Sequence, residues 1–175
     1  MTKDQEYNQK GLHVIAVLGV VLILLAISFI FVVRKFAVMK LVEEAPIKKQ
    51  IVFEDGIFAD VSVGGVIVSA EIAKSNDKKA EGLSNRKNLE KGKGMLFVFS
   101  SAGLYPFWNK DTFIPLDVLW IENNEVVYIG ELPAFSGGET AVAASDRKAN
   151  FVLEVNAGFV KEYNIKIGDP FTINK

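Results

Sequence analysis

An uncharged run near the start of the chain, Leu12 to Val33, most constrains how this protein can fold. Its 22 residues read LHVIAVLGVVLILLAISFIFVV, and His13 is the one titratable side chain among them. As a helix the run would be about 33 Å long, which matches the roughly 30 Å hydrocarbon core of a bilayer. Signal-peptide apolar regions are shorter, and Arg34-Lys35 follow directly with no A-x-A cleavage site. The run predicts an uncleaved, single-pass transmembrane anchor rather than the alternative, a buried core helix.

The rest of the 175-residue chain divides around this anchor. Residues 1–11 form a short polar tail, and residues 34–50 form a charged juxtamembrane linker that contains Pro46. Residues 51–175 are long enough to fold as one domain with its own core.

Basic residues on the two sides of the anchor bear on its orientation. Two lysines precede it, whereas five basic residues follow it: Arg34, Lys35, Lys40, Lys48 and Lys49. Because basic residues favour the cytoplasmic side of a span, this count places the C-terminal domain in the cytoplasm.

The pattern of residues 51–175 predicts a mainly β domain, a small curled or barrel-like sheet with one or two short helices. Residues 66–73 alternate as a strand does, and the wholly apolar residues 95–99 suit a strand that is buried on both faces. Asn123-Asn124 tolerates the positive φ angles of a type I′ turn between strands 117–122 and 125–130. Ser75 is a predicted helix cap, with Gly82 ending that helix. Other predictions are an extended segment that begins at Phe107-Trp108, strands at 151–155 and 171–173, a loop at 135–145 and a short helix near 159–163.

Several common chemistries have no residues to support them. The chain has no cysteine, and its single histidine lies in the anchor. This excludes thiol catalysis, cysteine zinc sites and an imidazole base in the domain. No phosphate-binding glycine loop is present, and a net charge of −1 argues against a broad nucleic-acid surface. We therefore expect no metal site, no cofactor and no nucleic-acid partner, and we expect a binding role rather than an enzymatic one.

Charged residues concentrate beside an aromatic residue in the segment Trp108-Asn109-Lys110-Asp111-Thr112. If this segment is a strand, Trp108, Lys110 and Thr112 share one face. Arg86 is a candidate partner for Asp111 or Asp117, because a guanidinium pairs well with a carboxylate. These charges either lock loops together or bind a ligand, and Trp108 is either a core residue or a stacking platform. Trp120 is a predicted core residue.

Several motifs resemble the family known as domain of unknown function 192. They are Gly82-Leu83-Ser84-Asn85-Arg86, Gly94-Met95-Leu96-Phe97-Val98-Phe99, Phe107-Trp108-Asn109-Lys110-Asp111-Thr112, Ile114-Pro115-Leu116-Asp117 and Leu153-Glu154-Val155-Asn156-Ala157-Gly158. Ser84, Asn109 and Asp111 depart from methionine, methionine and asparagine in the family pattern. The resemblance implies a small, mostly β domain, often behind an export signal or anchor, with no activity that defines the family. It therefore favours an extracytoplasmic domain, against the basic-residue count.

The candidate ligand-binding residues combine the matched polar positions with the charged segment. They are Arg86, Trp108, Lys110, Asp111, Thr112, Asp117 and Glu154. Strand alternation places Glu154 on the face of Val152, directed either at the mouth of the barrel or at solvent.

Three functions compete on these observations. The first is a membrane-anchored binding module for a small polar or carbohydrate-like molecule at the cell envelope. The second is a structural domain that binds another envelope protein. The third is an enzyme in which Asp111 or Asp117 acts as acid or base on a glycan.

Overall fold

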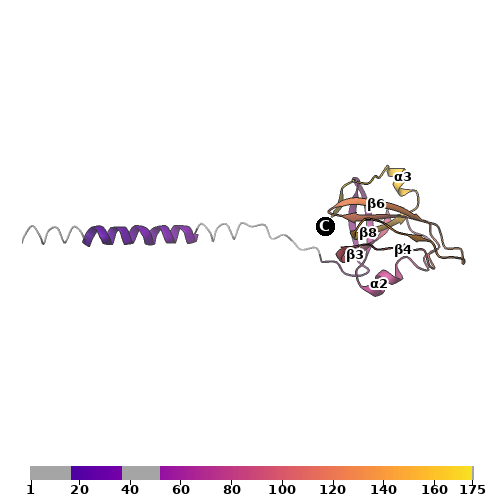
Figure 1. Ribbon diagram of the computed structural model, residues 1–175, viewed down its shortest axis with the longest axis horizontal. Coiled ribbons are helices and arrows are strands. Elements are labelled where there is room, and N and C mark those ends of the chain that lie inside the picture. Colours follow the sequence, from indigo (N-terminus) through magenta and orange to yellow (C-terminus); the bar gives the residue numbers. More distant parts are fainter. Residues whose placement is uncertain (1–16, 37–51, 175) are drawn as a thin grey trace, which may run out of the picture. The chain divides into compact units, whose positions relative to one another are not determined.

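The computed structural model describes residues 17–36 and 52–174 (Figure 1). The chain divides into two compact units, Met1–Gln50 and Ile51–Lys175. In the first unit a helix covers Val17–Phe36 and is long and apolar enough to cross a membrane, a criterion that a signal sequence also meets. The predicted tail over residues 1–11 lies outside the described residues, as do residues 12–16 of the predicted anchor and 37–50 of the predicted linker.

One curled, seven-stranded sheet forms the second unit, which confirms the mainly β prediction (Figure 1). Its strand order is β6-β5-β8-β3-β2-β1-β9. Neighbouring strands are antiparallel except for the parallel pair β2 and β3. The strands are β1 (Phe58–Val63), β2 (Val66–Ala73), β3 (Lys93–Gly103), β5 (Leu116–Glu122), β6 (Glu125–Leu132), β8 (Ala149–Asn156) and β9 (Phe171–Ile173).

Two short helices and a two-stranded ribbon complete the domain. Helix α2 (Asn76–Glu81) lies in the connection between the parallel strands β2 and β3, and helix α3 (Phe159–Tyr163) follows β8. Strands β4 (Phe107–Trp108) and β7 (Val142–Ala143) pair as a separate two-stranded ribbon.

Local signals in the sequence account for several of these elements. The Ser75 side chain accepts a hydrogen bond from the Lys78 backbone N–H, and Gly82 ends α2 with a φ of +52°. Asn123 and Asn124 have φ angles of +53° and +63°, as a type I′ hairpin requires at both central positions. These findings confirm the predicted helix and the predicted hairpin.

The sheet carries a separate hydrophobic cluster on each face. Leu153 and Val155 of β8 belong to one cluster, and Val152 belongs to the other, together with Met95, Phe97, Val118 and Trp120. Because side chains alternate along a strand, Glu154 lies on the face of Val152. A carboxyl group is thus built into the second cluster, at the centre of the sheet.

Candidate functional site

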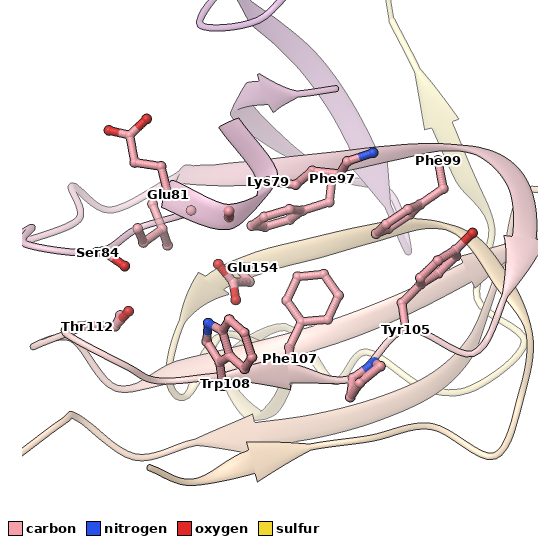
Figure 2. Close-up of a pocket in the computed structure, with 14 residues that line it drawn as sticks. Lys79, Glu81, Ser84, Phe97, Phe99, Tyr105, Phe107, Trp108, Thr112 and Glu154 are labelled. Carbon is pink, nitrogen blue, oxygen red and sulfur yellow. The ribbon is translucent and has the colours of Figure 1, made fainter. Parts of the chain in front are cut away.

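An open cavity of about 290 Å³ lies over this second face, between α2, β3, β4 and β8 (Figure 2). Its size is close to the lower end of small-molecule sites, which occupy about 300–1,000 Å³. We call it the aromatic pocket, because five of its lining residues are Phe97, Phe99, Tyr105, Phe107 and Trp108. The remaining lining residues come from α2 and the turn after it, together with Pro106, Thr112 and Glu154.

Glu154 is the one β8 residue in the lining of this pocket. Its carboxyl group points towards the space between Phe97 and Trp108 (Figure 2). The residue is only 4% exposed, since Met95 of β3 and Val118 of β5 flank it in the sheet. Burial raises the pKa of Glu154 to about 8, because desolvation disfavours the charged form of a carboxyl group. Glu154 is therefore a largely neutral carboxylic acid at pH 7.

The five aromatic lining residues form one wall of the pocket, which we call the aromatic wall. Its rings pack against one another. Phe97 and Phe107 pack edge to face with ring centroids 4.7 Å apart, and Phe99 stacks on Tyr105 at 3.6 Å. Phe107 also packs against the buried Trp120, whose indole N–H donates to the Tyr105 carbonyl at 2.8 Å. The wall is thereby fixed to the core of the domain.

Trp108 stands at the mouth of the pocket and is 60% exposed. Trp108 is therefore not a core residue, and its exposed indole lines the cavity. Trp120, by contrast, is fully buried, which confirms that prediction.

The segment after Trp108 is a turn, which corrects the expected strand alternation. Strand β4 ends at Trp108, and the Thr112 N–H donates to the Asn109 carbonyl at 3.0 Å. Asp111 adopts a φ of +55°, a left-handed conformation that Asp tolerates in turns. As a result Trp108 and Thr112 line the pocket, but Lys110 and Asp111 do not.

Asn109 explains why this turn is stable. Its side-chain amide donates to the Pro133 carbonyl at 2.8 Å, and its side-chain oxygen accepts from the Ala141 N–H at 2.8 Å. Asn109 therefore joins its own turn to both ends of the loop between β6 and β7. Its departure from the family pattern did not reveal this structural role.

Arg86 pairs with Glu71 rather than with Asp111 or Asp117, which corrects the expected pairing. Its guanidinium lies 2.6 Å from one Glu71 oxygen, and the Lys78 ammonium lies 2.8 Å from the other. Burial disfavours the Glu71 carboxylate, but the hydrogen bonds from Lys78 and Arg86 outweigh it and lower the pKa of Glu71. The parallel β2–α2–β3 crossover brings these three residues together. Arg86 thus ties the turn after α2 to β2, away from the aromatic pocket.

Asp117 is also outside the lining of the pocket. It is buried in β5, and its carboxylate accepts a hydrogen bond of 2.8 Å from the Val160 backbone N–H in the first turn of α3. Asp117 therefore fastens α3 to the sheet.

We expect Asp117→Ala to lower the free energy of unfolding by about 1–3 kcal/mol, because the Val160 N–H loses its acceptor in a partly buried position. Asp117→Asn keeps an acceptor oxygen and should cost less. Urea unfolding of both variants measures the difference. Equal stability of Asp117→Ala and the unmodified domain would contradict this capping role.

The structure thus brings together three of the seven predicted site residues, Trp108, Thr112 and Glu154. Sequence reasoning missed the pocket residues Ser84, Phe97, Phe99, Tyr105 and Phe107. One available signal was the spacing of Phe97 and Phe99, which puts two aromatic side chains on one face of a strand.

Comparisons with known proteins agree with this fold. The model of the family described as Uncharacterized ACR, domain of unknown function 192, matches residues 59–173. No curated protein matches the chain.

Two solved structures are similar to the chain. One, from Sinorhizobium meliloti 1021, is described as a "putative transcription regulator"; it has 27% identity and a TM-score of 0.60, and the match covers 71% of this chain and 97% of that one. The other, a protein of unknown function from Novosphingobium aromaticivorans, has 26% identity and a TM-score of 0.61, with 73% and 89% covered. The Sinorhizobium chain consists almost entirely of the matched fold, and residues 51–175 of this chain form a compact unit.

Proposed function

The chain belongs to the domain of unknown function 192 family, and from the aromatic pocket we propose that it is a membrane-tethered binding module for a small organic molecule. The small polar or carbohydrate-like ligand expected from the sequence would stack on Trp108 and form a hydrogen bond to Glu154.

The observation that carries this proposal is the carboxyl group of Glu154. A buried polar group costs free energy unless it has a hydrogen-bond partner. Within residues 17–36 and 52–174, no hydrogen bond or ion pair contributes to the pKa of Glu154, and burial is its only cause. A carboxyl group directed into an open cavity without a protein partner is well placed to receive a ligand.

Screening the domain (residues 52–175) against a fragment library tests the proposal. The library should hold monosaccharides, sugar alcohols, amines and aromatic acids, with binding followed through amide chemical shifts in NMR spectra. We expect saturable binders whose shift changes centre on Phe97, Trp108 and Glu154. Trp108→Ala should weaken the binding about fivefold, because stacking on a large ring contributes on the order of 1 kcal/mol.

Ile67→Ala is the matched control. Ile67 is 62% exposed, as Trp108 is, but lies on β2 outside the lining of the pocket, and its substitution should leave binding unchanged. A library without binders at the pocket, or binders that Trp108→Ala leaves unaffected, would refute the binding role.

The helix over Val17–Phe36 supports the tether. We place the domain outside the cytoplasm at the cell envelope, because the family resemblance implies a domain that often follows an export signal or anchor. The basic residues after the anchor favour the opposite side. Protease digestion of intact cells tests this placement. Cleavage of the domain supports it, and protection of the domain until the cells are lysed contradicts it.

A protein-interaction domain is the second candidate function. Val142 pairs with Trp108 across the β4–β7 ribbon, and both side chains are more than half exposed. Apolar side chains grouped at a rim are typical of contact surfaces. A glycan-cleaving enzyme has less support, because neither Asp111 nor Asp117 lines the aromatic pocket.

A further inference from the structure

We propose that the aromatic pocket selects an organic ammonium ion, a primary amine on an aromatic or similarly apolar body, whose charged group pairs with Glu154. This inference rests on the proposed function and narrows it to one class of ligand. It depends on three observations: the direction of the hydrogen bonds around Glu154, the π faces of the wall and the position of Lys79.

The polar groups beside Glu154 are arranged as acceptors. The Ser84 hydroxyl donates to the Lys110 carbonyl at 3.1 Å, and the Thr112 hydroxyl donates to the same carbonyl at 3.3 Å. Both hydroxyl hydrogens are thereby used, so their oxygens offer lone pairs. The Ser84 and Thr112 oxygens therefore accept hydrogen bonds, and the Glu154 carboxyl group accepts as well once it is ionised. Together they favour a ligand group that donates several hydrogen bonds, as an ammonium does.

The aromatic wall favours a positive charge over a neutral or negative one. The faces of Phe97, Phe107 and Trp108 surround the space in front of Glu154 (Figure 2). Aromatic faces attract cations within about 6 Å of the ring centroid, most strongly when water is excluded. An anion would meet these faces and the carboxyl group together, so it is disfavoured.

Lys79 shows that this wall already holds a cation. Its ammonium lies 4.8 Å from the Phe99 ring centroid and donates to the Val98 carbonyl at 3.5 Å. Figure 2 shows this ammonium beside Phe99 and directed away from Glu154. The carboxyl group is therefore left for a second cation, which the ligand would supply.

Binding would transfer a proton to solvent. The Glu154 carboxyl group is largely protonated at pH 7, because burial raises its pKa to about 8. When an R–NH₃⁺ group arrives, the carboxyl O–H bond breaks, the proton passes to buffer, and the ammonium and carboxylate form the pair. The other titratable groups of the lining are Lys79 and Glu81 of α2 and Tyr105. Glu81 already pairs with Lys78 at 3.1 Å, and the Tyr105 hydroxyl donates to the Ser101 carbonyl.

Three probes of similar size and different charge test the inference: benzylamine, benzyl alcohol and benzoate. Calorimetry on the domain at pH 7 and at pH 8.5, in two buffers of different ionisation enthalpy, gives both the affinity and the number of protons released. At pH 8.5, where Glu154 is mostly ionised, we expect benzylamine to bind about tenfold more tightly than benzyl alcohol, since a charge-assisted hydrogen bond exceeds a neutral one by roughly that factor. At pH 7 the preference should be smaller, because the carboxyl group must first lose its proton. Benzoate should bind weakest, and benzylamine should release close to one proton.

Two variants assign the effect to one carboxyl group. Glu154→Gln should remove the preference for benzylamine over benzyl alcohol and the proton release. Glu131→Gln is the control, because Glu131 is an exposed residue of β6 outside the lining, and it should preserve both. If benzyl alcohol binds as tightly as benzylamine at pH 8.5, or if Glu154→Gln leaves the preference intact, the amine inference fails while the binding function stands. If none of the three probes binds, the inference fails, and the fragment screen alone decides whether the binding function fails as well.

Discussion

At pH 9 the Glu154→Gln domain should be more stable than the unmodified domain by about 2–4 kcal/mol, whereas at pH 5 the two should be nearly equal. Burial raises the pKa of Glu154 to about 8 in the folded domain, from an ordinary value of 4.5. The folded state therefore holds a proton that the unfolded state has released. The stabilisation that the folded domain gains by keeping Glu154 protonated is fully present below about pH 4.5. It is lost as the pH rises through about 8. Glutamine is neutral throughout and avoids this loss.

Urea unfolding at several pH values between 5 and 9 measures the effect. Glu131→Gln is the control, because Glu131 is an exposed residue of β6, and its difference from the unmodified domain should be small at every pH. A constant difference between Glu154→Gln and the unmodified domain across this range would show that the Glu154 carboxyl group is not held neutral.

Trp120→Ala should destabilise the domain by about 3–5 kcal/mol, the range for truncating a buried aromatic side chain. Trp120 is fully buried, packs against Phe107 and Tyr128, and donates a hydrogen bond to the Tyr105 carbonyl. The variant leaves a cavity and removes that donor. It should also loosen the pocket wall, because Tyr105 and Phe107 both line the pocket.

Trp108→Ala is the matched comparison for Trp120→Ala. Trp108 is exposed, and its loss should change the free energy of unfolding by about 1 kcal/mol or less. Urea unfolding measures the free energy of unfolding of both variants, and it should show a large loss for the buried Trp120 and a small one for the exposed Trp108. Equal destabilisation by the two substitutions would contradict this division of roles.

Much of the fold is predictable because its signals are local. The bounds of β2 follow from its apolar alternation, α2 from the Ser75 cap and Gly82, and the hairpin from two asparagines that accept positive φ angles. Strand β1 was missed. Only Val61 and Val63, at one end of the strand, are buried, so its apolar alternation is short. Its pairing with β2 and β9 defines it in the structure.

The site is less predictable because its contacts are not local. Alternation assigns Glu154 to a face of β8, but whether that face meets solvent, core or cavity depends on α2 and β4, which lie far away in sequence. In the same way, Arg86 contacts Glu71 because it lies in the connection between the parallel strands β2 and β3, and this connection runs back past β2. Lys110 and Asp111 seemed to belong with Trp108 because a left-handed residue in their turn was not anticipated.

A crystal structure of the domain soaked with benzylamine tests the central claim, that the Glu154 carboxyl group receives the ammonium group of a ligand. The account predicts the amine nitrogen about 2.7–2.9 Å from a Glu154 oxygen, with the benzyl ring against Phe107 and Trp108. A crystal in which the Lys79 ammonium pairs with Glu154, and benzylamine is absent from the pocket, would contradict it.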